Sequence, residues 1–245
     1  MPARADARIV GLNHSDGGVS TMIRIHNFPR GARGLRAGWV CAEMSLAYEY
    51  APVGYPTSAT FVALNPLGTV PVLEDGAARI TESVAIMLYL AQAYGPTQLL
   101  PASDDPAFAE VLDLTVFGEA ALGACLNPLL AARFAAPDDE KRGWSVERLE
   151  ARVHKQLAWL SERLGSNVWF AGAELTLADI SIETALRMWQ GGLGGPIPKN
   201  LAAYRDRLKD RPAYQSAVLV LDSLQNPPTT RDYSAASQPR AGSER

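Results

Sequence analysis

Strand-like and helix-like patterns are segregated along this chain, and this segregation constrains the fold more than any single motif. Residues 22–27 alternate apolar and polar side chains, the period of a half-buried strand. A helical spacing follows over residues 33–46, and a second short strand pattern occupies residues 48–53. Because a strand, a helix and a strand follow each other so closely, the two strands are expected to pair in parallel through a crossover.

The next segment predicts a short helix and then a hairpin. The helix is expected at residues 57–64 and a strand at residues 70–73. Asp75-Gly76 is a strong hairpin signal, which places the return strand at residues 78–81. An amphipathic helix is expected over residues 82–94. The predicted order is therefore βαβ, a helical connector, and ββα.

Beyond Tyr94 the strand patterns stop. A turn-rich linker at residues 96–105 is followed by helical patterns at 106–132, 138–164, 177–189 and 200–208, and by a last one from 212. This change of element type predicts an α/β domain at residues 22–95 and an all-helical domain at residues 106–224. Residues 1–21 are expected to be a flexible extension, and residues 225–245, rich in Pro, Ser, Thr and Arg, a disordered tail.

Composition narrows the classes of partner. The 245 residues carry a formal net charge of -3. The chain therefore lacks the excess of basic residues that would indicate a nucleic acid or an anionic membrane as its partner. The 2 cysteines form no CxxC pair and the 3 histidines are scattered, so neither a disulfide framework nor a metal site is predicted. A reduced, cytoplasmic setting is expected. No apolar run approaches the roughly 20 residues of a membrane span.

Pro71 lies inside the strand pattern at residues 70–73, where a proline cannot donate to the ladder. Two interpretations remain open. A cis proline beside a ligand site would turn the backbone of Val70 outward, so that Val70 pairs with an extended peptide as an added strand does. A trans proline at a sheet edge would have no such role.

Two predicted helix starts carry polar residues. At residues 81–83, Thr-Glu-Ser, the free N–H groups and partial positive charge of a helix N-terminus suit a carboxylate. Ser83 would bind that carboxylate and Glu82 an ammonium group, with plain helix capping as the alternative. At residues 176–179, Thr-Leu-Ala-Asp has the spacing of a capping box, for which a structural role is expected.

Taken in order, these segments resemble the glutathione transferase family, in its bacterial cytosolic form. Residues 65–73, Asn-Pro-Leu-Gly-Thr-Val-Pro-Val-Leu, and residues 80–91, Ile-Thr-Glu-Ser-Val-Ala-Ile-Met-Leu-Tyr-Leu-Ala, are similar to the glutathione-site signature of that family. Residues 175–180 are similar to the capping motif of its helical domain. The resemblance covers residues 22–220 and implies a thioredoxin-like domain followed by an all-helical domain.

The resemblance also implies roles for individual residues. Pro71 would be cis, and Val70 would pair through its backbone with the cysteinyl part of glutathione. Glu82 and Ser83 would bind the γ-glutamyl end. Thr69 stands where a lysine or glutamine often reaches the glycyl carboxylate, and a threonine is shorter than either. Glutathione would be a co-substrate and no metal would be needed.

The segment that usually activates the thiol departs from the family pattern. Residues 27–39, Asn-Phe-Pro-Arg-Gly-Ala-Arg-Gly-Leu-Arg-Ala-Gly-Trp, resemble bacterial members with an Arg-Ser-x-Arg-x-x-Trp run, but Ala32 and Gly34 occupy the serine positions. No Tyr, Ser, Thr or Cys lies between Asn27 and Val40. A thiolate would then be stabilised by the Asn27 amide, by backbone N–H groups from Ala32 to Gly34, or by nearby arginines.

Three arginines follow Asn27 closely. Arg30, Arg33 and Arg36 would lower the pKa of a thiol by their charge, or would form an ordinary solvated loop and helix face. The candidate catalytic residues are accordingly Asn27, Arg33 and Gly34. Cys41 lies well inside the helix pattern, away from the N-terminus that favours a thiolate, and is interpreted as a buried structural residue.

The expected function is transfer of the glutathione thiolate to a small, largely apolar electrophile, as in detoxification. The substrate pocket is expected between the domains, with Phe28, Phe117 and Leu126 as candidates. The missing hydroxyl favours one alternative, a weakly catalytic binding or regulatory protein of the same fold. A glutathione-dependent isomerase or lyase is another. The resemblance also implies a homodimer, for which the helices at residues 82–94 and from 106 offer surfaces.

Overall fold

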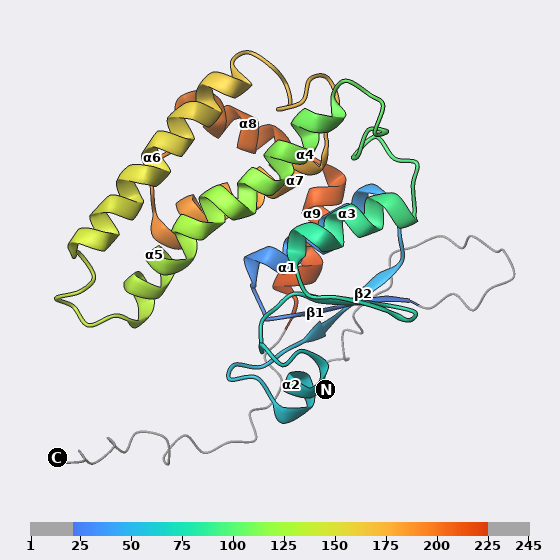
Figure 1. The fold of residues 1–245 in the computed structure, drawn as a ribbon, viewed down its shortest axis with the longest axis horizontal. Helices are drawn as coiled ribbons and strands as arrows, with labels where there is room; N and C mark the ends of the chain where they lie inside the picture. Colours follow the sequence, from blue (N-terminus) through green and yellow to red (C-terminus); the bar gives the residue numbers. More distant parts are fainter. Residues whose placement is uncertain (1–21, 225–245) are drawn as a thin grey trace, which may run out of the picture.

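The computed structural model describes residues 22–224, which form an α/β domain and a helical domain, as predicted (Figure 1). The elements of the α/β domain are β1 (Ile23–Asn27), α1 (Ala32–Glu43), β2 (Tyr48–Pro52), α2 (Ala59–Leu64), β3 (Val72–Asp75), β4 (Ala78–Ile80) and α3 (Ser83–Ala93). The predicted order βαβ–α–ββα is therefore confirmed. The extension and the tail expected at residues 1–21 and 225–245 lie outside the described residues.

A four-stranded sheet in the order β2-β1-β3-β4 organises the first domain. β1 pairs in parallel with β2, with Ile23 opposite Tyr48, because the crossover helix α1 connects them. β3 pairs with β1 and β4 in antiparallel fashion. The hairpin turns at Gly76, whose φ of 57° suits glycine. Helices α1 and α3 cover one face of the sheet, and α2 lies on the other (Figure 1).

The helical domain contains α4 (Phe108–Phe117), α5 (Ala124–Ala135), α6 (Trp144–Leu164), α7 (Leu177–Arg187), α8 (Lys199–Lys209) and α9 (Pro212–Asp222). Two π-helical segments, η1 (Gly118–Gly123) and η2 (Met188–Gly192), interrupt it. α4, η1 and α5 form one helix, Phe108–Ala135, that is long and apolar enough to cross a membrane, with a mean hydropathy of 1.4. Of the most apolar 18-residue stretch of this helix, 44% is buried inside the protein. Core helices of soluble proteins reach the same length and hydropathy.

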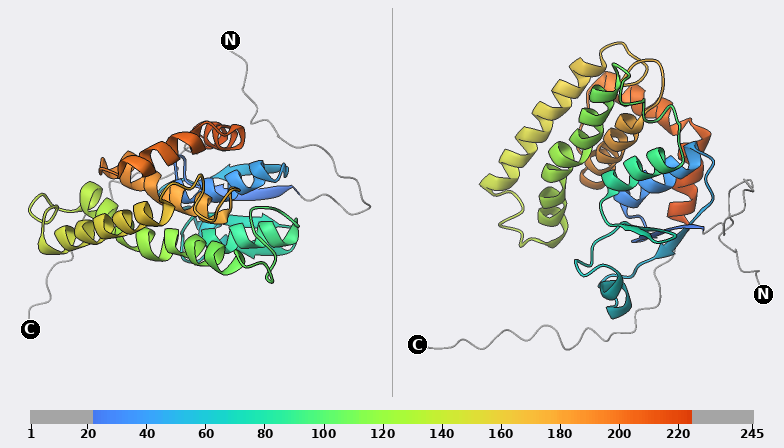
Figure 2. Two further views of the ribbon diagram at one scale, coloured as in Figure 1. Left: turned by 90° about the horizontal axis from the view of Figure 1, so that it is seen from above. Right: turned by 45° about the vertical axis from the view of Figure 1, so that its right-hand side comes forward.

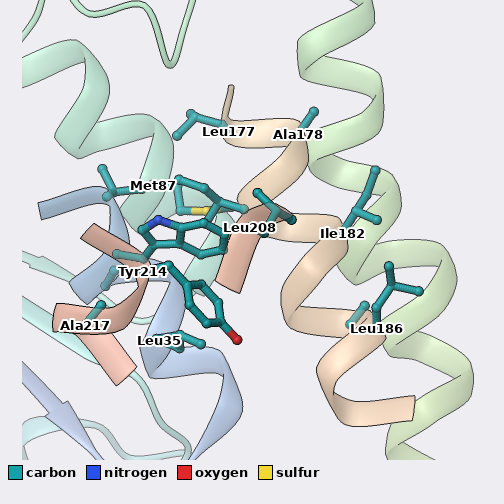
Figure 3. Close-up of a cluster of buried hydrophobic side chains, with 14 of the residues drawn as sticks. Leu35, Met87, Leu177, Ala178, Ile182, Leu186, Leu208, Tyr214 and Ala217 are labelled. Carbon is teal, nitrogen blue, oxygen red and sulfur yellow. The ribbon is translucent and has the colours of Figure 1, made fainter. Parts of the chain in front are cut away.

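Helix α7 is the centre of the hydrophobic core. Every residue from Leu177 to Leu186 is buried. Figure 3 shows Ile182 and Leu186 on the side of α7 that faces the long helix, drawn in green, and Leu35 and Tyr214 near the other side. Because Leu35 belongs to α1 and Tyr214 to α9, one buried cluster joins the two domains.

Asp179 closes the start of α7, as the capping-box spacing predicts. Its Oδ2 accepts hydrogen bonds from the backbone N–H and the hydroxyl of Thr176, at 2.9 and 3.1 Å. Its Oδ1 accepts from the backbone N–H of Phe170 and the hydroxyl of Tyr204, both at 3.0 Å. The carboxylate is fully buried, so it satisfies polar groups that have no access to water.

Helix α9 returns to the α/β domain and packs on α1. The rings of Trp39 and Tyr214 meet edge to face, with centroids 4.7 Å apart. Arg211 donates two hydrogen bonds of 2.8 Å to the carboxylate of Glu43. The views in Figure 2 show α9 (red-orange) beside α1 (blue), and α6 (yellow) at the edge of the molecule away from the strands. The last helix therefore fastens the helical domain to the sheet domain.

Candidate functional site

A cavity of about 660 Å³ lies between the two domains. The wall from the α/β domain comprises residues that follow β1 and β2 or precede β3: Asn27, Phe28, Arg30, Gly31, Arg33, Tyr55, Gly68, Thr69 and Val70. The wall from the helical domain comprises residues of α5, α7 and η2: Leu130, Arg187, Met188, Gly191 and Gly192. A concave, partly apolar space of this size suits a small-molecule ligand.

Asn27 ends β1 and fills the space beside the first turn of α1. Its side chain is fully buried, and Nδ2 donates a 2.9 Å hydrogen bond to the carbonyl oxygen of Gly31. A Cβ atom added at Gly34 would collide with this amide group. Glycine at position 34 is therefore required by Asn27, which explains why no serine stands there.

One of the two amide hydrogens of Asn27 is already engaged in this geometry. Its Nδ2 faces the carbonyl of Gly31, and the atom without a hydrogen-bond partner among residues 22–224 is Oδ1, an acceptor. An acceptor oxygen repels an anionic sulfur, whereas a donor attracts it. Asn27 holds the loop that precedes α1, and its role as a donor to a thiolate stays a prediction.

The loop before β3 forms the neighbouring edge of the cavity. Nδ2 of Asn65 donates to the backbone oxygen of Thr69 at 2.8 Å and to its Oγ1 at 3.2 Å, so the Thr69 side chain is held by the loop itself. The Val70-Pro71 peptide bond is cis, so of the cis and trans interpretations left open by the sequence, the cis one is correct. The antiparallel ladder between β1 and β3 runs no further than Val72 opposite His26. The backbone of Val70 therefore lies beyond the ladder, at the cavity.

The start of α3 lies outside the residues that line the cavity. Glu82 is the exposed N-cap residue and makes no capping hydrogen bond with its side chain, so the plain-capping alternative is not supported. Ser83 is only 3% exposed, and its Oγ accepts a 2.9 Å hydrogen bond from Arg36. The first backbone N–H groups of any helix lack intrahelical partners. A cation and a helix N-terminus therefore meet at Ser83.

Arg36 connects the two domains. The side chain is completely buried and donates to Ser83 Oγ, to Glu119 Oε2 and, at 3.2 Å, to the backbone oxygen of Ser181. Glu119, on η1, also pairs with Arg33 at 2.9 Å. Burial raises the pKa of Glu119, but the charges and hydrogen bonds of Arg36 and Arg33 outweigh it and hold that pKa below its ordinary value. Glu119 is thus an anion clamped between two arginines of α1.

The sequence matches the N-terminal domain of glutathione S-transferase over residues 33–93 and the C-terminal domain of glutathione S-transferase over residues 145–207. Glutathione S-transferase 3 of Zea mays is 30% identical over 226 residues, which cover 85% of this chain and 98% of the maize protein. The chain belongs to the glutathione S-transferase family.

Other members of the glutathione S-transferase family are similar over most of the chain. GstA of Escherichia coli O157:H7 is 30% identical over 162 residues, which cover 64% of this chain and 76% of the bacterial protein. The theta class glutathione S-transferase of Xanthomonas axonopodis pv. citri, solved with glutathione bound, superposes with a TM-score of 0.69 at 27% identity. That comparison covers 80% of this chain and 97% of the Xanthomonas chain.

In this glutathione S-transferase, the structure brings several predicted site residues to one cavity and leaves others elsewhere. Those that line it are Asn27, Phe28, Arg33, Thr69 and Val70. Pro71, next to Val70 in the chain, is buried, and Gly34 is buried against Asn27. Glu82 and Ser83 lie beside Arg36, at the start of α3.

Two expected pocket residues are wrong. Leu126 is fully buried in the core, and Phe117 packs against Trp159 with ring centroids 4.8 Å apart, so neither lines the cavity. Their apolar character is explained by packing between the helices of the second domain. The interpretation of Cys41 agrees with its environment, since the side chain is fully buried and burial raises the pKa of its thiol.

The sequence patterns did not predict the wall of the cavity that the helical domain forms. Residues of η2 contribute Gly191 and Gly192, and a Cβ at Gly191 would meet no atom within 4 Å. π-Helical segments within α-helices are frequent at functional sites. The signal available in the sequence was the Gly191-Gly192 pair directly after a helical pattern.

No group of His, Cys, Asp and Glu suited to a metal ion occurs among residues 22–224.

Proposed function

We propose that this protein conjugates glutathione to a small electrophile held in the cavity between the domains. The thiolate sulfur would form a bond to an electrophilic carbon, the leaving group would depart with its electron pair, and the thiol proton would pass to solvent. The observation that carries the proposal is the meeting, at one cavity, of Val70, the first turn of α1 and Arg33. Glutathione bound to the Xanthomonas relative supports glutathione as the co-substrate.

Arg33 is the residue that we assign to the thiolate. Its Nε is buried and has no partner among the described residues, although its terminal nitrogen pairs with Glu119. A donor that carries positive charge lowers the pKa of a nearby thiol. The backbone N–H groups of the first turn of α1, around Gly34, add the partial positive charge of a helix start. This pair of features replaces the hydroxyl that is absent between Asn27 and Val40.

The remaining contacts of glutathione follow from the geometry of its surroundings. The unpaired backbone of Val70, next to Pro71, offers the edge of a strand to the cysteinyl part. Ser83 and the start of α3 suit the α-carboxylate of the γ-glutamyl end, while exposed Glu82 suits its ammonium group. Thr69 contributes its backbone rather than a long side chain.

We place the protein in the cytoplasm as a homodimer, with domains at residues 22–95 and 106–224 joined by a linker at 96–105. Phe28, on the α/β wall of the cavity, would also contact the electrophile. The absent hydroxyl favours a second candidate, a binding or regulatory protein that holds glutathione without activating it. The two functions differ in turnover and not in affinity for glutathione.

Turnover of 1-chloro-2,4-dinitrobenzene with glutathione tests the proposal. The Ser83→Ala variant is expected to bind glutathione about tenfold more weakly, since it loses a hydrogen bond to a charged group. Titration calorimetry with glutathione measures that affinity. The Ser161→Ala variant makes the same change on α6, where Ser161 bonds Asn200, and should leave the affinity unchanged. Binding without turnover in the unmodified protein would exclude conjugation, and equal affinities of the two variants would return Ser83 to a structural role.

A further inference from the structure

The cavity carries more positive charge than Arg33, which we assign to the thiolate, supplies. Within the part of the chain that the structure describes, its lining contains three arginines, Arg30, Arg33 and Arg187, and no aspartate or glutamate. Charged groups in a concave, low-dielectric space focus the potential and raise the local concentration of ions of opposite charge. The cavity therefore favours anionic molecules over neutral ones of the same shape.

The three arginines differ in how well their charges are neutralised. Arg33 has Glu119 at 2.9 Å. Among residues 22–224, the partners of Arg187 are Asp222 Oδ1 at 3.8 Å and the hydroxyl of Tyr214 at 3.4 Å, both distant. Arg30 forms no salt bridge with any residue between 22 and 224, and it is exposed. Arg187 and Arg30 are thus the guanidinium groups that can receive a carboxylate.

The positions of these two arginines assign them to different ligands. Arg30 follows β1 and lies on the wall that also carries Thr69 and Val70, the side proposed for glutathione. Arg187 is the last residue of α7, on the opposite wall. Its neighbours on that wall are Leu130, Met188 and the two glycines of η2. The wall opposite glutathione therefore combines an apolar surface with the cation of Arg187, 32% of whose side chain is exposed.

We propose that the electrophile carries a carboxylate, which Arg187 binds while Leu130 and Met188 contact its apolar body. The inference rests on the proposed conjugation and adds the substrate class. A guanidinium binds a carboxylate through two parallel hydrogen bonds, so it fixes the orientation of the substrate as well as its charge. The reacting carbon is thereby presented to the sulfur at the opposite wall, and the proximity of the two groups accelerates the reaction.

A matched pair of substrates tests this proposal. 4-Chloro-3,5-dinitrobenzoate and 4-chloro-3,5-dinitrobenzamide share the reacting carbon and the leaving chloride, and only the first carries a charge. Each kcat/KM is divided by the uncatalysed rate of the same compound with glutathione. The unmodified protein is expected to prefer the benzoate by about tenfold, the value of one charge-assisted hydrogen bond. Arg187→Gln should abolish that preference, and because the preference is a ratio of two rates it does not depend on any general change of activity in the variant.

Two further variants serve as controls. Arg187→Lys retains the charge and should retain part of the preference. Arg163→Gln makes the same substitution at an arginine that pairs with Glu110 at 2.9 Å and does not line the cavity, so it should change nothing. Equal rates for both compounds in the unmodified protein, or a preference that survives in Arg187→Gln, would overturn the proposal and leave conjugation intact. Absence of turnover with both compounds would overturn conjugation and this inference together.

Discussion

Replacing Asp179 by alanine is expected to lower the free energy of unfolding by about 4 kcal/mol, because it removes a buried carboxylate that accepts four hydrogen bonds. The backbone N–H groups of Phe170 and Thr176 and the hydroxyl of Tyr204 would be left buried without acceptors. The loss also removes the cap of α7, the helix on which both domains pack. Urea-induced unfolding followed by circular dichroism measures the change.

The matched control is Asp206→Ala. Asp206 lies on α8, is exposed to solvent and forms its one salt bridge within residues 22–224 with Lys209, one turn away. Its removal should leave the unfolding midpoint nearly unchanged. If the two alanine variants unfold at the same denaturant concentration, the network around Asp179 does not stabilise the second domain as described.

Glu119→Gln is expected to cost about 3 kcal/mol near neutral pH, because it leaves the fully buried guanidinium of Arg36 without its anionic partner. Glutamine preserves the shape and one acceptor oxygen, so the variant isolates the charge. Glu110→Gln is the control, since Glu110 forms a surface pair with Arg163 in which both side chains are about two-fifths exposed. That substitution should change the stability by no more than about 0.5 kcal/mol.

The cost of Glu119→Gln should depend on pH in a defined direction. The pKa of Glu119 is lowered in the folded protein from its ordinary value of 4.5, so the unfolded chain takes up the proton first. The stabilisation is therefore fully present above pH 4.5 and is lost as the pH falls through the lower, folded-state pKa. The stabilities of the variant and the unmodified protein should converge below that point. A difference that stays constant from pH 7 to pH 3 would contradict the ion-pair account.

The features that sequence predicts correctly depend on residues that are close together in the chain. The alternation that gives β1, the Asp75-Gly76 turn and the capping box at Thr176 and Asp179 are each determined within a few residues. The cluster at Arg36 is different, because its partners Ser83, Glu119 and Ser181 lie 47, 83 and 145 residues away. No local pattern distinguishes an arginine that will be buried from one on a solvated helix face.

The residues that line the pocket are equally difficult to predict from local sequence patterns. Phe117 and Leu126 were reasonable candidates by composition, yet apolar residues on helices mostly pack in cores, as these two do. The helical wall is built instead from Arg187, Met188 and glycines of η2, whose arrangement depends on a π-helical segment. The position of Asn27 against Gly34, which excludes a serine, also requires coordinates.

We propose that this protein activates glutathione through Arg33 and the start of α1 rather than through a hydroxyl. The most direct test is the ultraviolet thiolate absorbance of bound glutathione as a function of pH. A free cysteine thiol has a pKa of about 8.5, and we predict that the bound thiol titrates at least about one unit lower. Arg33→Gln should return the titration toward the free value, whereas the exposed Arg79→Gln should not. A bound thiol that titrates at the pH of free glutathione would contradict the account.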